Sequence, residues 1–76
     1  MKLTQRQAFN RLTKMANGAY ATVEMYLSRY GRSYSGYISD VGIVKGRSFE
    51  DVVKKMAKKM SEYEARLNSE TNARLL

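Results

Sequence analysis

Apolar residues recur every three or four positions in the first part of the chain, which is the period of an amphipathic helix. Thr4 and Gln7 have the spacing of a capping box, and Asn17-Gly18 can adopt the left-handed conformation that ends a helix. The pattern therefore predicts a helix over residues 4–16. Its apolar side consists of Ala8, Phe9, Leu12, Met15 and Ala16.

From Tyr20 onward the pattern changes to strict alternation, which is typical of a half-buried strand. Ala21, Val23, Met25 and Leu27 point to one side, and tyrosine, threonine, serine and glutamate side chains point to the other. A helical interpretation remains open, because Tyr20, Val23, Leu27 and Tyr30 also share one helical face. The alternation is longer and cleaner, so we predict a strand over about residues 20–29.

Gly31-Arg32 fits a two-residue hairpin turn with glycine at its first central position. A second strand then covers about residues 34–40, and Asp40-Val41-Gly42 forms a turn into a third strand at about residues 43–47. This turn predicts the following cross-strand pairs: Tyr26 with Tyr37, Met25 with Ile38, and Leu27 with Gly36.

The last predicted element is a helix over residues 48–67, with Ser48 as its N-cap and acidic residues in its first turn. Its apolar stripe consists of Phe49, Val52, Val53, Met56, Met60, Tyr63 and Leu67. Lys54, Lys55, Lys58 and Lys59 lie on the opposite side. Residues 68–76 are mostly polar, so we expect a C-terminal tail that frays or docks weakly on a neighbour.

These elements predict one α+β domain over residues 1–76. Two helices would cover one face of a two- or three-stranded antiparallel sheet in the order αββ(β)α, and the other face would be left to solvent. A chain of 76 residues has room for one small core.

The residues that usually carry catalysis are missing. The chain has no histidine and no cysteine, which excludes the common metal ligands, cysteine nucleophiles and histidine-based triads. We therefore expect no enzyme, no metal and no cofactor. The sequence shows no disulfide framework, no signal-peptide core and no membrane-spanning stretch, so we expect a cytoplasmic protein, in the host cytoplasm if the source is viral.

The charge is strongly positive, with fourteen basic residues against seven acidic ones and a net charge of +7. Such an excess is typical of proteins that contact phosphate, although it also suits a well-solvated surface. Residues 1–49 carry eight of the basic side chains against Glu24 and Asp40 alone. The lysines of the last helix add four more.

Tyrosines and arginines provide a second candidate surface. The predicted hairpin places four tyrosines on the open face of the sheet, with two arginines beside the turn, where aromatic rings can stack on unpaired bases or contact a protein. The candidate binding residues are Tyr20, Tyr26, Tyr30, Tyr37, Arg29, Arg32, Lys54, Lys55, Lys58 and Lys59. A homo-oligomer paired through sheet faces or strand edges is a further possibility.

The order of helix, strands and helix resembles that of double-stranded RNA-binding domains. The shared features are Gly46 before the last helix and the lysines at positions 54, 55, 58 and 59. In that family the lysines stand at the start of the helix, where they meet phosphates across the groove. This helix instead begins with Ser48-Phe49-Glu50-Asp51.

The whole chain is also similar in size and style to short accessory proteins of bacteriophages, including anti-CRISPR and other host-takeover inhibitors. The similar features are the brief first helix, the tyrosine-rich hairpin and the Gly-x-Ser-Phe-Glu entry into the last helix at residues 46–50. This resemblance implies binding to a host protein and inhibition by steric occlusion.

Two functional hypotheses follow from the sequence. The first is a non-catalytic module that contacts nucleic acid through basic and tyrosine-rich surfaces, and the second is a phage-type inhibitor of an acidic host protein. We favour nucleic acid because the basic excess is a direct property of the sequence.

Overall fold

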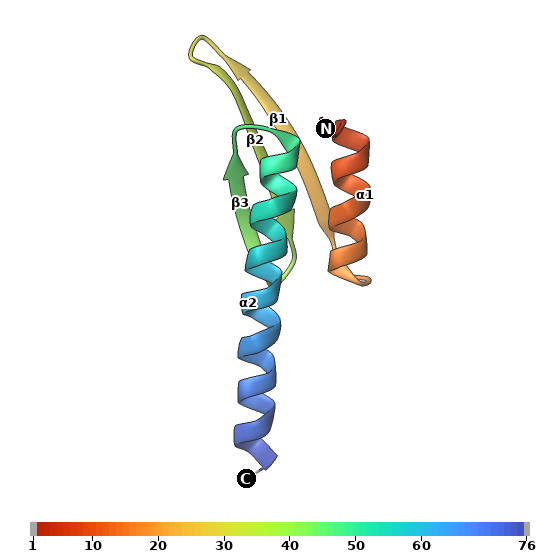
Figure 1. Cartoon of the computed structure of the whole chain (residues 1–76), viewed down its shortest axis with the longest axis vertical. Coiled ribbons are helices and arrows are strands. Elements are labelled where there is room, and N and C mark those ends of the chain that lie inside the picture. Colours follow the sequence, from red (N-terminus) through yellow and green to blue (C-terminus); the bar gives the residue numbers. More distant parts are fainter. Residues whose placement is uncertain (1, 76) are drawn as a thin grey trace.

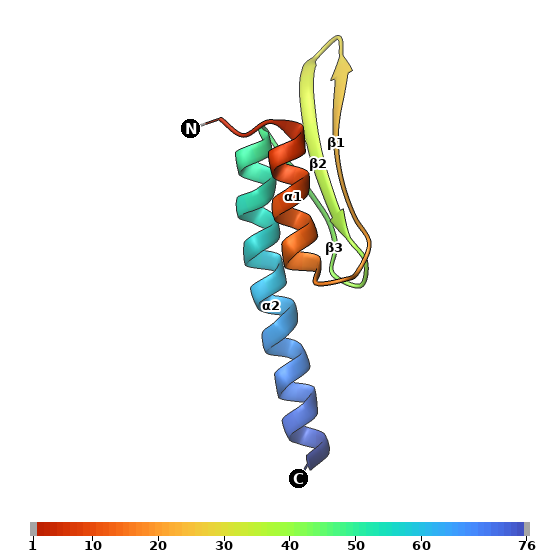
Figure 2. The ribbon, with the colours of Figure 1, turned by 90° about the vertical axis from the view of Figure 1, so that its right-hand side faces the viewer.

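The computed structural model describes the backbone of residues 2–75 and the side chains of residues 2–70. The elements are α1 (Gln5–Ala16), β1 (Ala21–Ser28), β2 (Gly31–Ile38), β3 (Gly42–Gly46) and α2 (Phe49–Leu75). The strands form an antiparallel sheet in the order β1-β2-β3, and both helices cover the same face of it (Figures 1 and 2). The α+β architecture is confirmed, and residues 21–28 are a strand.

Local hydrogen bonds fix the start of α1, and a left-handed residue ends it. The Thr4 hydroxyl accepts a hydrogen bond from the Gln7 amide at 3.1 Å, and the Gln7 side chain accepts one from the Thr4 amide at 2.9 Å. At the other end Asn17 is left-handed, with φ of 48°. The capping box and the left-handed residue therefore determine where α1 begins and ends.

The predicted hairpin register is wrong by four residues. Tyr26 faces Ser33 rather than Tyr37, and Leu27 faces Arg32 rather than Gly36. The turn residues are Arg29 and Tyr30, and β2 already starts at Gly31. A shift by an even number keeps every side chain on its predicted face, so the apolar side of β1 still faces the helices.

The backbone conformation of Gly31 explains this register. Positive φ falls on Gly31, at 116°, and neither Arg29 nor Tyr30 has a positive φ. A type I turn followed by a left-handed glycine is a common hairpin connection, whereas the predicted turn would have placed the glycine inside the loop. The Ser28 hydroxyl completes the turn, because it accepts a hydrogen bond from the Tyr30 amide and donates one to the Gly31 carbonyl.

The core lies between the helices and the sheet, and its closest approach is at Gly36. A β-carbon at Gly36 would lie 2.8 Å from Leu12 of α1 and 2.7 Å from Val52 of α2. Leu12, Val52, Ile38 and Met56 are the largest fully buried side chains. Both helices therefore rest on Gly36, where β2 has no side chain to keep them apart from the sheet.

The helices and strands differ in length, so the β1–β2 hairpin projects at one end of the molecule and α2 at the other. The twelve residues of α1 span about 18 Å, whereas the eight residues of β1 span about 27 Å. The far end of the β1–β2 hairpin consequently extends past the first turns of both helices (Figure 2). At the opposite end α2 continues beyond the sheet (Figure 1).

The predicted end of the last helix is also wrong. Residues 68–75 continue α2 instead of forming a polar tail, and Leu76 lies outside the described residues. The chain has no glycine after Gly46 and no proline at all, so nothing in this stretch is a strong signal for ending the helix.

We predict that Gly36→Ala destabilises the protein by about 1–3 kcal/mol, because the new methyl group displaces both Leu12 and Val52 from a packed core. The loss is measured by urea unfolding followed by circular dichroism. Ser33→Ala, at an exposed position of the same strand, is the matched control. Equal stability of the two variants would contradict the role of Gly36.

Candidate nucleic-acid interface

The face of the sheet away from the helices, which we call the open face, contains a shallow depression of about 500 Å³. It combines tyrosine rings with short hydroxyl side chains and carries one acidic and one basic residue, Glu24 and Lys45. The Tyr26 hydroxyl donates a hydrogen bond to the Glu24 carboxylate. The remaining side chains of the open face are Thr22, Ser33, Ser35, Tyr37 and Ile43, with Tyr20 beside them.

Three of the four candidate tyrosines belong to the open face. The rings of Tyr20 and Tyr37 lie 6.3 Å apart and are tilted by 59°, and Tyr26 follows on the same side of β1. Tyr30 lies elsewhere, because it occupies the hairpin turn, where 91% of its surface is exposed. It was expected beside the others because the predicted turn was placed two residues too late.

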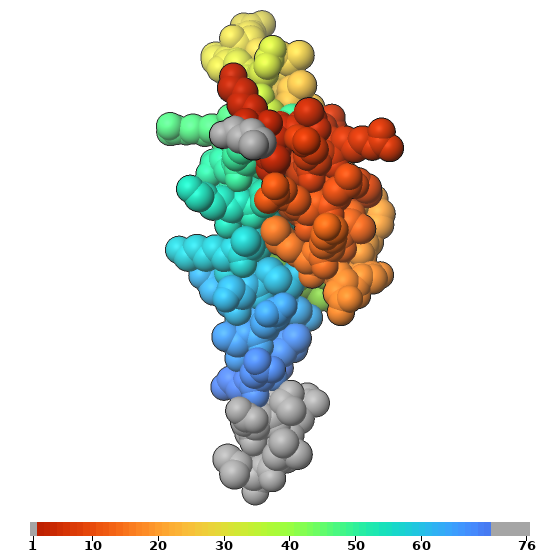
Figure 3. All heavy atoms as spheres, turned by 45° about the vertical axis from the view of Figure 1, so that its right-hand side comes forward, coloured from red at the N-terminus to blue at the C-terminus, as the bar shows by residue number. Residues whose placement is uncertain are grey.

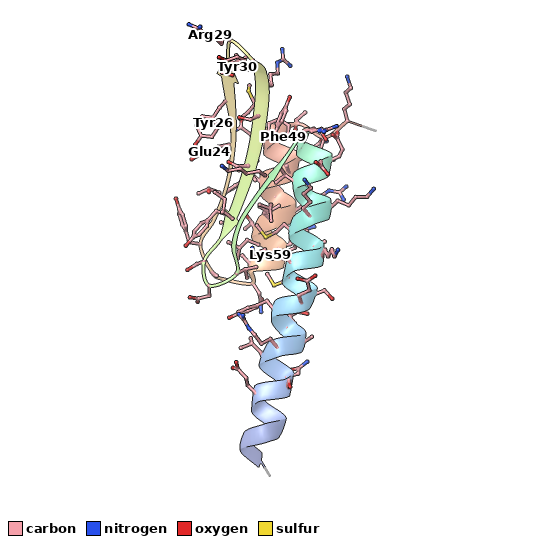
Figure 4. The ribbon with its side chains drawn as sticks, turned by 90° about the vertical axis from the view of Figure 1, so that its left-hand side faces the viewer. Glu24, Tyr26, Arg29, Tyr30, Phe49 and Lys59 are labelled. Atoms are coloured by element: carbon pink, nitrogen blue, oxygen red, sulfur yellow. The ribbon has the colours of Figure 1, made fainter. Side chains whose placement is uncertain are left out.

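The projecting end of the hairpin, residues 27–32, which we call the hairpin tip, carries both candidate arginines. Figure 4 shows Arg29 and Tyr30 at this end. Arg29 lies in the turn, and Arg32 lies opposite Leu27 on the side of the ribbon that faces the helices. Leu27 is 71% exposed. This end of the hairpin extends past the first turns of both helices (Figure 2). Sequence reasoning missed this leucine by assigning it to the core, although comparing the length of a twelve-residue helix with that of an eight-residue strand would have found it.

The four candidate lysines separate into two pairs. The Lys55 ammonium donates a hydrogen bond to the Lys45 carbonyl at 2.9 Å and lies 3.4 Å from Asp51. Lys59 packs near Gly42, where a β-carbon would lie 3.1 Å from its side chain. These two lysines therefore lie along the β3 edge of the sheet, whereas Lys54 and Lys58 point into solvent.

Exposed basic side chains of α1 extend the surface formed by Lys54 and Lys58. Arg11 and Lys54 line the same shallow depression between the two helices. We call the exposed basic side chains of the two helices the basic helix surface: Arg6, Arg11, Lys14, Lys54 and Lys58. Figure 3 shows long side chains of both helices extending from the body of the molecule.

The charge is unevenly distributed along the molecule. Residues 1–60 contain twelve basic and four acidic side chains, whereas residues 61–76 contain two basic and three acidic ones. The open face has balanced charge, with Glu24 and Lys45 as its acidic and basic residues. The positive charge is thus concentrated on the helix layer and around the hairpin tip rather than among the tyrosines of the open face.

Asp51 ties the start of α2 to the end of β3. Its carboxylate accepts a hydrogen bond from the Arg47 amide at 3.0 Å, and this bond, together with the nearby Lys55 ammonium, lowers the pKa of Asp51 below its ordinary value of 3.8. Gly46 makes room for the contact, since a β-carbon there would lie 2.8 Å from the carboxylate.

The described residues contain neither a cluster of metal ligands nor a membrane-spanning helix. Among them, no group of three histidine, cysteine, aspartate or glutamate side chains converges to hold a metal ion. No helix in this part of the chain has an apolar stretch long enough to cross a bilayer.

Comparison with protein-family models, curated proteins and solved structures finds no match to this chain. The function is therefore inferred from the geometry and charge of the chain itself.

We predict that stability falls as the pH drops through the lowered pKa of Asp51, because the unfolded chain takes up that proton at a higher pH than the folded chain. The contribution is fully present well above pH 3.8, the ordinary value, and is lost below the folded-state pKa. Urea unfolding at a series of acidic pH values measures it. Asp51→Asn should show a weaker pH dependence than the wild type. Identical pH profiles for Asp51→Asn and the wild type would contradict this assignment.

Proposed function

We propose that the protein is a non-catalytic nucleic-acid-binding module of the cytoplasm. The observation that supports this most strongly is the placement of its charge. The basic helix surface and the hairpin tip together hold seven exposed basic side chains, and phosphate contacts by lysine and arginine supply most of the affinity of such proteins.

The shape of the molecule supports a duplex rather than an unpaired strand. Two-stranded ribbons of DNA-binding proteins enter the major or the minor groove of the double helix, and the hairpin tip is a ribbon of this kind. The open face, where unpaired bases would stack, has three tyrosines but balanced charge. Proteins that bind single strands use a positively charged groove that follows the nucleic-acid backbone. The open face has no such excess of positive charge.

A second function has one observation in its favour. The open face combines tyrosine, hydroxyl and aliphatic groups with balanced charge, which is closer to a protein-binding surface than to a phosphate-binding one. In this proposal the protein inhibits a host protein by covering part of its surface. The two functions use different faces, so variants can separate them.

We predict that the wild-type protein binds a labelled duplex DNA with an affinity that falls by orders of magnitude between low and high salt. Arg11→Gln combined with Lys54→Gln should weaken binding to all sequences alike and reduce the salt slope by about one for each phosphate that the variant no longer neutralises. Fluorescence anisotropy at several salt concentrations measures both quantities, with single-stranded DNA and duplex RNA as further probes.

A control for the loss of one positive charge is Arg66→Gln, which lies in the part of α2 beyond the sheet and should leave the slope unchanged. Absence of binding to all three probes at low salt would rule out the nucleic-acid function. A pull-down of a stoichiometric protein, abolished in Tyr26→Ala combined with Tyr37→Ala, would then favour the inhibitor.

A further inference from the structure

Leu27 is the most exposed large aliphatic side chain among the described residues. It lies at the hairpin tip, opposite Arg32 and two residues before Arg29. Its exposed fraction is 71%, and the neighbouring turn residue Tyr30 is 91% exposed. Exposure of a single apolar side chain is common, but an apolar group at the end of a projecting ribbon has nothing in the described part of this chain to cover it.

The ribbon is held in shape before any partner arrives. Burial along β1 ends at Val23, whose carbonyl accepts a hydrogen bond from the Gln5 side chain at 3.0 Å, and the strand is exposed from Glu24 onward. Past this point the pairing of β1 with β2 continues to Ser28 and Gly31. The two hydrogen bonds of the Ser28 hydroxyl then close the turn.

The surroundings of Leu27 are positive. Residues 25–39 include Arg29 and Arg32 and contain no acidic side chain. Lys2 and Arg47 precede α1 and α2, whose first turns lie together at the foot of the hairpin, where the Leu3 amide donates a hydrogen bond to the Glu50 carboxylate (Figure 1). An apolar group with basic side chains on both sides complements a deformed DNA groove, in which bases are exposed between two rows of phosphates.

From this geometry we infer that the hairpin tip enters the minor groove of duplex DNA and that Leu27 inserts between two base pairs, bending the duplex. The inference rests on the proposed nucleic-acid function and specifies its substrate. Arg29 and Arg32 would lie in the groove, where the negative potential attracts arginine. Lys2 and Arg47 would meet the flanking phosphates.

A preferred substrate follows from the same chemistry. Partial unstacking costs a few kcal/mol, and it costs least at flexible pyrimidine–purine steps such as TA and CA/TG. The protein should therefore prefer duplexes that contain these steps over stiff A-tracts of equal length, although it makes no base-specific hydrogen bonds through Leu27.

Bending is measured by energy transfer between dyes at the two ends of a short duplex with a central TA step, and binding is measured on the same sample by anisotropy. The wild-type protein should increase the transfer on binding. Leu27→Ala should still bind, and the increase should disappear. Ile43→Ala, which removes a similarly exposed aliphatic group from the open face, is the matched control and should bend the duplex as the wild type does.

The outcomes separate the two proposals. Binding by the wild type with unchanged transfer would overturn the wedge and leave the nucleic-acid function in place. Bending that persists in Leu27→Ala would also overturn it. Failure to bind any nucleic acid would overturn both proposals. Circular dichroism confirms that the variants fold, which is expected because both positions are exposed.

Discussion

The close approach of two helices to Gly36 is the contact on which the rest of the molecule depends. Leu12 and Val52 come from different helices and meet over Gly36. A side chain at position 36 would push both of them away from the sheet. A chain of 76 residues buries a small core, so few contacts of this kind hold the layers together. Gly36 is therefore required by packing, whereas Gly31 is required by the positive φ of its backbone.

The position of this contact also explains the shape of the functional surfaces. The helices pack on the half of the hairpin nearest the β2–β3 turn, and a strand rises about twice as far per residue as a helix. The hairpin tip consequently remains uncovered beyond the helix starts, and α2 remains uncovered beyond the sheet. The proposed groove contact lies on one of these projections, and the packed layers serve as its base.

Much of the fold could be predicted from the sequence, because the signals were local. The alternation from Ala21 to Leu27 predicted a strand, and the residues around Thr4 and Asn17 predicted both ends of the first helix. The hairpin turn was placed two residues too late because a glycine next to a turn can occupy a central position or the position after it, and the alternation is the same in both registers. The C-terminal end of α2 differs from the prediction, because the polar composition of residues 68–75 favours fraying but includes no residue that ends a helix.

The candidate site was only partly predictable. The tyrosines at positions 20, 26 and 37 share a face as expected. A register error of an even number of residues does not change which face a side chain is on. The division of the four lysines into two pairs follows from helical spacing, because residues four positions apart share a face. Which pair lies beside β3 depends on contacts between elements, such as the hydrogen bond from Lys55 to the Lys45 carbonyl, and these leave no pattern in the sequence. Leu27 resembles a core residue by alternation and is exposed because α1 is short.

The most direct test of the proposed binding mode is a titration of the ¹⁵N-labelled protein with a short duplex DNA, followed by the amide chemical shifts of each residue. Binding through the helix layer and the ribbon should change the shifts at the hairpin tip and on the outer sides of α1 and the first half of α2. The shifts of Thr22, Tyr37 and Ile43 should stay in place. Changes confined to the open face, or no changes at all at low salt, would contradict this binding mode.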